Sequence, residues 1–252
     1  MRLLLHTAES SSRDLALEEA IHTLLEEGTS SNTWRLWQAR QNTVVIGTGQ
    51  EAAREVNLDA AKKDSIAVLR RHSGGGAVII GPGMINFSAF YHFKDLPGSD
   101  TIRGAMLGAL NPVIQLLDGW GVHACDAGLS DLAVMSKDGT LRKIAGNAQA
   151  RKKKSVLVHG TLLANPDWQR LSGLLRYPSK APDYRAGRDH RSFLTSLKDL
   201  QVHYDLDAFA AALVSILGSS VAIEREPSKE EMNRAQQLVE EKYGNETWNF
   251  RR

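Results

Sequence analysis

Residues 70–78 read Arg-Arg-His-Ser-Gly-Gly-Gly-Ala-Val and are the most informative stretch of this 252-residue chain. They follow an apolar run at 66–70 that predicts a buried strand. Three consecutive glycines permit backbone conformations that a side chain would forbid, so their amides can converge on an anion. The adjacent arginines offer charge-assisted donors to phosphate or carboxylate. The spacing matches neither a dinucleotide fingerprint nor a P-loop, and on glycine content alone a tight turn with solvated arginines is the simpler interpretation.

The segments on either side of this loop predict an α+β fold. Apolar residues at helical spacing indicate helices at 14–27, 58–63, 101–120, 207–217 and 229–243, with an interruption at Asn111-Pro112. Strands are expected at 33–37, 43–46, 66–70, 84–91, 131–135, 142–144 and 156–163. Because the strands cluster centrally, we expect a mixed, mostly antiparallel sheet flanked by helices, in a single domain over residues 1–252.

Composition narrows the function classes. The 31 basic and 29 acidic side chains nearly cancel, so no strongly basic surface argues for nucleic acid. A single cysteine, Cys125, rules out an intrachain disulfide and fits a reducing compartment. No apolar run reaches the roughly 18 residues of a membrane helix, and the N-terminus lacks a signal-peptide core. We therefore expect a cytoplasmic protein that binds neither nucleic acid nor membrane.

Two further motifs follow the glycine loop. Residues 143–149 read Lys-Ile-Ala-Gly-Asn-Ala-Gln, and Lys143 can neutralise a bound phosphate or polarise an acyl carbonyl. The plainer interpretation is an exposed strand lysine. Residues 159–163 read His-Gly-Thr-Leu-Leu, where His159 by itself is more typical of a hydrogen-bonded structural histidine than of a catalyst.

In this order and spacing, the three motifs resemble those of the lipoate–protein ligase A family, within the biotin and lipoate ligase superfamily. Its members carry an RRxSGGGAV loop, a K-[IV]-[SA]-G-x-A strand and an HGTLL strand. The segments 15–19, 42–47, 128–132 and 242–250 also resemble family elements, with Ser130 in place of an Asn. The resemblance spans nearly the whole chain and implies a biotin/lipoate ligase-like catalytic domain.

The resemblance implies a reaction in two steps. ATP activates the lipoate carboxylate as lipoyl-adenylate, and a lysine of a lipoyl carrier domain then attacks the acyl carbon. The implied carriers are the E2 subunit of a dehydrogenase complex, the glycine cleavage H protein or a similar domain.

The family's functional residues carry over to positions of this chain. Lys143 is the implied catalytic residue, contacting the acyl carbonyl and the α-phosphate, and Asp131 is expected near the adenylate and Mg²⁺. The other residues expected to bind lipoyl-adenylate are Arg71, Ser73, Gly74, Gly75, Gly76, Val78, Gly146, Ala148, His159 and Gly160. We expect Val45, Val78 and Phe87 to form the apolar slot for the acyl tail.

The sequence departs from the family pattern after the glycine loop. Members usually continue with His-Asp-x-Gly-Asn, whereas residues 79–86 read Ile-Ile-Gly-Pro-Gly-Met-Ile-Asn, which weakens any metal or nucleotide role for a carboxylate there. Asn86 is the candidate for the family Asn. The resemblance ends at the close of the family's large domain, and it implies either a separate accessory protein for adenylation or the use of preactivated acyl groups. The loop at 182–193 is interpreted either as a cap that contacts the carrier or as a surface loop satisfying its own charges.

Two other functions remain open. In related octanoyltransferases a cysteine thioester carries the acyl group, and Cys125 precedes Lys143 at a comparable position. Against this, those enzymes show Gly-Gly-Arg where this chain has Gly74-Gly75-Gly76, and they lack a G-x-x-D-L element like that at 128–132. A non-catalytic binder of lipoyl-adenylate or of a carrier is the third possibility. We favour the ligase.

Overall fold

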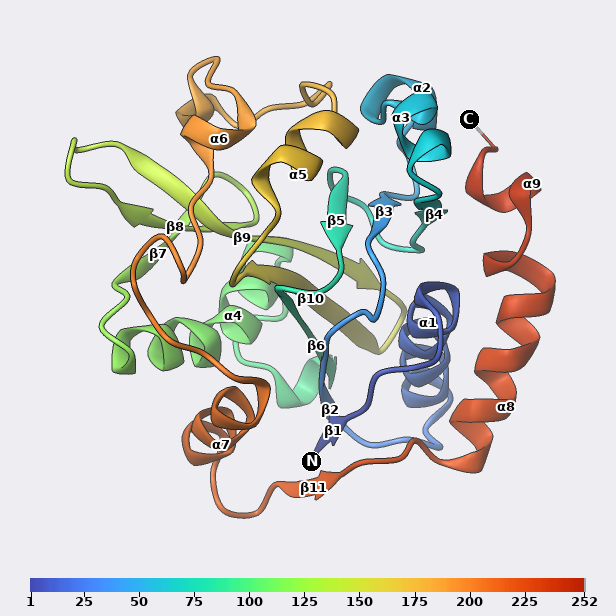
Figure 1. Cartoon of the computed structure of the whole chain (residues 1–252). Coiled ribbons are helices and arrows are strands. Elements are labelled where there is room, and N and C mark those ends of the chain that lie inside the picture. The colour runs from blue at the N-terminus through green and yellow to red at the C-terminus, as the bar shows by residue number, and fades with distance from the viewer. Residues whose placement is uncertain (252) are drawn as a thin grey trace.

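The computed structural model describes residues 1–251, and in this part of the chain the strands form two sheets (Figure 1). The large sheet has the strand order β11-β1-β2-β6-β10-β9-β8-β7, and the small sheet has the order β4-β3-β5. The large sheet comprises β1 (Arg2–Leu5), β2 (Thr33–Trp37), β6 (Met84–His92), β7 (Ala124–Ala127), β8 (Asp131–Met135), β9 (Leu141–Arg151), β10 (Ser155–Leu163) and β11 (Ala222–Glu224). The small sheet comprises β3 (Thr43–Ile46), β4 (Ala67–Arg70) and β5 (Val78–Ile80).

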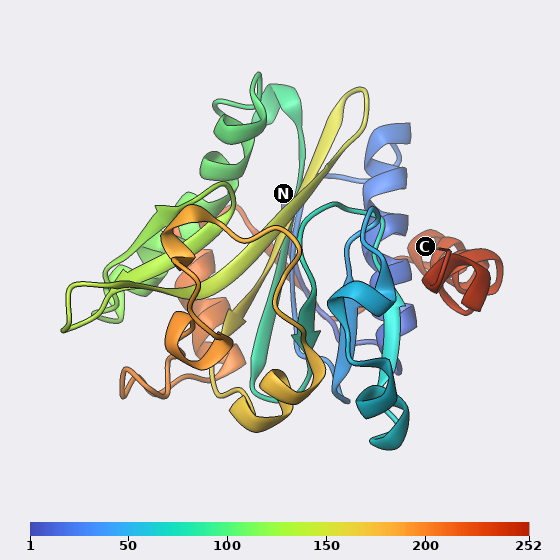
Figure 2. The same ribbon diagram turned by 90° about the horizontal axis from the view of Figure 1, so that it is seen from above.

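Helices cover both faces of the large sheet (Figures 1 and 2). On one face lie α4 (Ile102–Gly119) and α7 (Leu206–Leu217); on the other lies α1 (Ser11–Glu27), with α8 (Lys229–Leu238) packed on its outer side. The remaining helical segments are α2 (Ala52–Glu55), α3 (Leu58–Lys63), α5 (Trp168–Leu174), α6 (His190–Phe193), α9 (Glu246–Asn249), the π-helix Val239–Tyr243 and the 3-10 turns Phe93–Asp95 and Asp183–Arg185.

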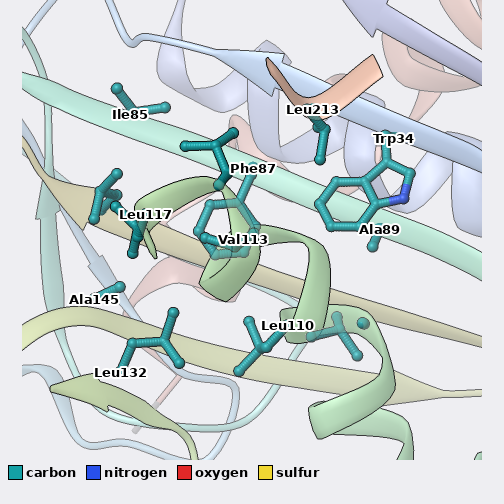
Figure 3. Close-up of a cluster of buried hydrophobic side chains, with 14 of the residues drawn as sticks. Trp34, Ile85, Phe87, Ala89, Leu110, Val113, Leu117, Leu132, Ala145 and Leu213 are labelled. Atoms are coloured by element: carbon teal, nitrogen blue, oxygen red, sulfur yellow. The ribbon is translucent and has the colours of Figure 1, made fainter. Parts of the chain in front are cut away.

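The strand pairing confirms the predicted α+β class with a mixed, mostly antiparallel sheet. Only β1 with β2, β1 with β11 and β3 with β4 run parallel among the described strands. Side chains alternate between the two faces: Phe87 and Ala89 of β6 pack under α4, as Figure 3 shows, while Phe90 packs under α1. Both faces of the central strands are therefore buried. No helix within residues 1–251 is long and apolar enough to cross a bilayer.

Local signals explain where the main helices begin and end. The Ser10 side chain accepts a hydrogen bond from the amide of Arg13 at the start of α1, and Gly28, with φ +83°, ends the helix. In α4 the expected interruption at Asn111-Pro112 is wrong, because Pro112 lies inside a continuous helix. The buried turns before and after it, which include Leu110 and Val113, outweigh the loss of one backbone hydrogen bond.

The other differences from the predicted elements concern short or weakly patterned strands. The elements that the sequence did not predict are the strands β1, β5, β7 and β11 and the helices α2, α5, α6 and α9. The expected helix at 229–243 ends at Leu238 and continues as a π-helix. The strand predicted at 142–144 extends from Leu141 to Arg151. Its small and amide residues have low strand propensity, but β8 and β10 pair with it from both sides.

Candidate active site

A cavity of about 1320 Å³ opens between the α1-side face of the large sheet, the small sheet and the segment 176–194. Residues directly opposite each other on neighbouring strands share a face of the sheet, and one such row crosses five strands along the cavity floor. It runs through Trp37, Asn86, Thr161, Gly146 and Asp131, from β2 to β8.

A β-bulge places Lys143 beside this row. The pairing of β8 with β9 shifts between Leu132 and Ala133, so that Ile144 is the extra residue. In a regular strand residues 143 and 146 would face opposite sides, whereas here both face the cavity. The Nζ atom of Lys143 lies 2.8 Å from Oδ1 of Asp131, and it lies above Gly146, where a Cβ would be only 2.7 Å away. The glycine in this motif therefore makes room for the ammonium group.

Arg71 holds the glycine loop together from inside. Its guanidinium donates to the carbonyls of Gly74 and Gly76, the latter at 2.8 Å, and its Nε donates to Oγ of Ser73 at 3.0 Å. Burial lowers the pKa of Arg71 to about 10, so it stays charged at neutral pH. Within residues 1–251, no backbone amide of residues 73–76 donates a hydrogen bond to another protein group. The loop carbonyls are thus occupied while its amides remain available to an anion.

The conformation of the loop requires glycine at two positions, Gly75 in the loop and Gly47 beside it. Gly75 has φ +87°, and a Cβ there would lie 2.8 Å from the guanidinium of Arg71. Gly47, at the end of β3, packs against the carbonyl of Gly75 with no room for a Cβ. A side chain at either position would force the loop away from the small sheet.

Beneath the loop, His159 belongs to a buried hydrogen-bond chain. Its Nε2 lies 2.7 Å from Oγ of Ser73, and its Nδ1 lies 3.0 Å from Oε2 of Glu18. The other carboxylate oxygen of Glu18, Oε1, accepts a hydrogen bond from Oγ of Ser88. Burial by itself raises the pKa of Glu18, but the charge and hydrogen bond of His159 together with Arg35 and Ser88 lower it to about 2. Glu18 is therefore ionised at neutral pH. With both ring nitrogens engaged, His159 supports the loop.

The segment 182–193 closes over the Lys143 side of the cavity. The hydroxyl of Tyr184 donates to Oδ2 of Asp131 at 2.8 Å, and burial together with Asp131 raises the pKa of Tyr184. The amide of Thr195 donates to the carbonyl of Lys143 at 2.9 Å, which fastens the end of the segment to β9. Arg185 and Arg188 donate to carbonyls of their own loop, while Nη2 of Arg185 and Nη1 of Arg188 are buried without a hydrogen-bond partner among residues 1–251.

The structure brings most of the expected site residues together around this cavity. Those that line it are Val45, Arg71, Gly74, Gly75, Gly76, Val78, Asp131, Lys143, Gly146, Ala148, His159 and Gly160. Ser73 is buried beneath the loop, where it contacts Arg71 and His159. The placement of Phe87 in the acyl slot is wrong. Its ring packs against Trp34 on the α4 side, because odd-numbered residues of this part of β6 point away from the cavity (Figure 3).

Cys125 lies outside the cavity lining. It is an exposed residue of β7 and donates weakly to the carbonyl of Ala133 at 3.6 Å. Because Cys125 pairs with Ala133 and Ala133 with Lys143, all three share one face of the sheet. Two strand spacings, about 10 Å, separate the backbones of Cys125 and Lys143. The thiol is therefore at the border of the site.

Sequence reasoning missed Glu18 and Tyr184 as parts of the site. A signal for Glu18 was present, since it lies four residues after Asp14 on the apolar, buried side of α1. Buried carboxylates at helical spacing indicate partners elsewhere in the fold. Tyr184 carried no such signal, because its contact with Asp131 depends on how the loop returns to β8.

A magnesium ion is the implied metal. Among the described residues, no group of three or more His, Cys, Asp and Glu side chains is gathered as a ligand set. Asp131 contributes one carboxylate, and Mg²⁺ is commonly held by one or two carboxylates together with substrate phosphates. The residues present fit a metal ion that arrives bound to a nucleotide rather than one held by the protein alone.

Comparison with known proteins places the chain in a family. A family model described as the lipoyl protein ligase A/B catalytic domain matches residues 11–218. The chain is 29% identical to lipoate–protein ligase A subunit 1 of Thermoplasma acidophilum, over 98% of its own length and 95% of that protein. It is also 29% identical to octanoyltransferase LipM of Symbiobacterium thermophilum, over 95% of its own length and 94% of that protein.

Similarity to solved structures supports the same family. An archaeal lipoylation system from T. acidophilum, a bi-partite lipoate protein ligase with its E2 lipoyl domain, contains a chain that matches with a TM-score of 0.81 and 28% identity, over 99% of this chain and 95% of that one. A lipoate–protein ligase A bound with ATP matches with a TM-score of 0.80 and 28% identity, over 99% of this chain and 98% of that one. The chain belongs to the lipoyl protein ligase A/B catalytic-domain family.

Proposed function

We propose that this enzyme is an ATP-dependent lipoate–protein ligase that forms lipoyl-adenylate and transfers the lipoyl group to a lysine of a carrier domain. The main support is the position of Lys143. Its ammonium group faces the cavity above Gly146 and is oriented by Asp131, and the same cavity is lined by the glycine loop, whose amides donate to no other group among residues 1–251. A cation with a fixed position in a partly buried site can stabilise negative charge that develops during acyl transfer.

The two steps assign separate tasks to these groups. In the first, a carboxylate oxygen of lipoate attacks the α-phosphorus of ATP, and pyrophosphate leaves. In the second, the carrier lysine attacks the acyl carbon, AMP leaves, and the amine loses a proton. Lys143 would contact the acyl carbonyl and the α-phosphate in both steps, while the amides of residues 73–76 would bind the adenylate oxygens. Arg71 would act by holding the loop, because its donors are already bonded to loop carbonyls.

Asp131 is our candidate ligand for Mg²⁺ that enters with ATP. The carboxylate binds Lys143 through one oxygen and Tyr184 through the other, so metal binding would compete with these contacts. Val45 and Val78 would line the slot for the acyl tail, together with Trp37 in place of Phe87.

We further propose a carrier domain and a second polypeptide as partners. The support is the similarity to the T. acidophilum lipoylation system, which comprises a bi-partite lipoate protein ligase and its E2 lipoyl domain. A solved T. acidophilum protein with bound lipoic acid matches this chain with a TM-score of 0.79 and 26% identity, over 99% of this chain and 98% of that one. Cys125 is the single cysteine, which agrees with a reducing compartment, so the cytoplasm is the proposed location.

The test is to incubate the purified chain with an apo lipoyl domain, lipoate, ATP and Mg²⁺ and to measure the intact mass of the carrier. We expect a lipoyl mass gain that requires ATP and is lost in Lys143→Ala. Lys137→Ala is the matched control, because Lys137 lies exposed in the turn between β8 and β9. If no gain occurs, lipoyl-adenylate replaces lipoate and ATP. Transfer from the adenylate alone would assign activation to the second polypeptide, whereas no transfer from either would contradict the ligase and favour a binder.

A second candidate function is octanoyl transfer from acyl carrier protein through Cys125. The similarity to an octanoyltransferase over nearly the full length of both proteins favours it, as does the shared face of Cys125 and Lys143. The exposed position of the thiol outside the cavity lining argues against it. The two functions are distinguished by supplying octanoyl–acyl carrier protein without ATP and measuring the intact mass of the lipoyl domain. An octanoyl gain that is lost in Cys125→Ala would establish the transferase.

A further inference from the structure

Asn86 is a polar side chain in an apolar part of the cavity. It lies on β6 directly between Trp37 of β2 and Thr161 of β10, and it is 3% exposed. The same cavity is also lined by Leu15, Trp37, Val45 and Ile80 of one hydrophobic cluster and by Val78, which packs against that cluster. A pocket that binds only a hydrocarbon chain offers no hydrogen-bond partner to a buried amide. The hydrogen bonds of Asn86 therefore need an explanation.

Only one side of the Asn86 amide is satisfied by the protein. Its Oδ1 accepts a hydrogen bond from Oγ1 of Thr161 at 2.8 Å, whereas its Nδ2 is buried without a partner among residues 1–251. Exchanging the amide oxygen and nitrogen leaves one unpaired polar atom in either case, because the Thr161 hydroxyl can donate or accept. An unpaired buried donor is costly, and native structures rarely keep one without a role.

The distance from Lys143 fits the length of an eight-carbon acyl chain. Lys143 lies above Gly146 on β9, and Asn86 lies two strands away in the same row, with Thr161 of β10 between them. Two strand spacings amount to about 10 Å. An extended eight-carbon chain with single bonds of about 1.5 Å spans roughly 9 Å. A chain whose acyl carbon lies at Lys143 therefore brings its distal carbons next to Asn86.

We infer that Asn86 is a specificity-determining residue that selects acyl groups carrying an acceptor atom at their distal end, such as the dithiolane sulfurs of lipoyl, over plain octanoyl. The inference rests on the proposed function. Sulfur is a weak acceptor that can take the Nδ2 hydrogen bond, whereas the methylene and methyl groups of octanoyl leave the buried donor unpaired. A site with a buried polar group discriminates against the analogue that cannot pair with it.

Competition between two preactivated substrates tests this. The chain is given an apo lipoyl domain with equal concentrations of lipoyl-adenylate and octanoyl-adenylate, and the ratio of the two acylated carriers is read by intact mass. We expect a lipoyl preference in the wild type that falls about fivefold in Asn86→Leu. Ile223→Val is the control, because Ile223 is exposed on β11 and does not line the cavity. Its ratio should equal that of the wild type.

Folding and function are checked separately. The double variant Asn86→Leu/Thr161→Val removes both hydrogen-bonding groups, and thermal unfolding identifies any variant that does not fold. An unchanged ratio in a folded Asn86→Leu or double variant would overturn the inference. If the wild type transfers neither group, the proposed function fails, and calorimetric titration with free lipoate and free octanoate then decides. A preference for lipoate that is lost in Asn86→Leu supports the inference, and equal affinities or no binding refute it.

Discussion

Two parts of the cavity wall differ in how they are held. The glycine-loop cluster consists of residues 71–76 with His159 and Glu18, and its charged and polar side chains are buried and almost fully bonded. The lysine cluster consists of Lys143 of β9, Asp131 of β8 and Tyr184, and it is held by one ion pair and one hydroxyl hydrogen bond. The first is fixed by folding, and the second can exchange its contacts for those of a ligand. Variants of the first should affect stability, and variants of the second should affect transfer.

The largest expected effect is on stability, from Glu18→Gln. A pKa lowered from 4.5 to about 2 in the folded state corresponds to about 3 kcal/mol of stabilisation of the ionised, buried carboxylate. The folded pKa of Glu18 is lowered from 4.5 to about 2, so its contribution is complete above pH 4.5 and disappears as the pH falls toward 2. Urea unfolding at pH 7, 5 and 3.5 should show a difference from the wild type that shrinks in this window. Glu27→Gln, at the exposed end of the same helix, is the control, and an equal loss there would refute the assignment.

Lys143→Ala should show the opposite pattern. We expect transfer to fall by about 10²–10³-fold, as for the loss of a donor that stabilises developing charge. The free energy of unfolding should change by no more than about 1 kcal/mol, because the lysine is partly exposed and Asp131 keeps its bond to Tyr184. The rate of transfer from lipoyl-adenylate measures the first effect, and urea unfolding measures the change in the free energy of unfolding. A large loss of stability would show that the lysine cluster is as structural as the loop.

Gly75→Ala tests the loop with a smaller change. The positive φ and the 2.8 Å approach to Arg71 should cost about 1–2 kcal/mol in unfolding free energy. Gly76→Ala is the matched control, because a Cβ there would meet nothing within 4 Å. Thermal unfolding of the two variants side by side gives the difference. Equal midpoints would mean that the loop is not held rigidly by Arg71.

The smallest expected effect comes from Tyr184→Phe. It removes one hydrogen bond to Asp131 and keeps the ring against Phe193, so we expect about 1 kcal/mol, or roughly a fivefold change in transfer rate. Tyr177→Phe, at an exposed position that precedes this segment and does not line the cavity, should leave the rate unchanged. If Tyr184→Phe instead reduces transfer as severely as Lys143→Ala, the cap takes a direct part in the chemistry.

The sequence by itself determined the fold class, the family and the motifs that meet at the cavity. The fold class followed from hydrophobic periodicity, which is a local property, and the family followed from the resemblance of three motifs to those of known ligases. The sequence also shows that Lys143 and Gly146 belong to one motif. It does not show the β-bulge that turns both residues toward the cavity. A bulge is set by how β8 pairs with β9, which no local pattern records.

Only the tertiary structure decided the roles of individual side chains. Whether Phe87 or Asn86 faces the cavity depends on the register of β6 between β2 and β10, where a shift of one residue exchanges the two faces. From the sequence, Arg71 could either contact the ligand or hold the glycine loop. In the structure its guanidinium donates to the carbonyls of Gly74 and Gly76, which assigns it to the loop. Glu18 reached His159 across 141 residues of sequence. Such long-range contacts depend on packing, so the residues alone predicted which groups are present, and the fold decided what each of them touches.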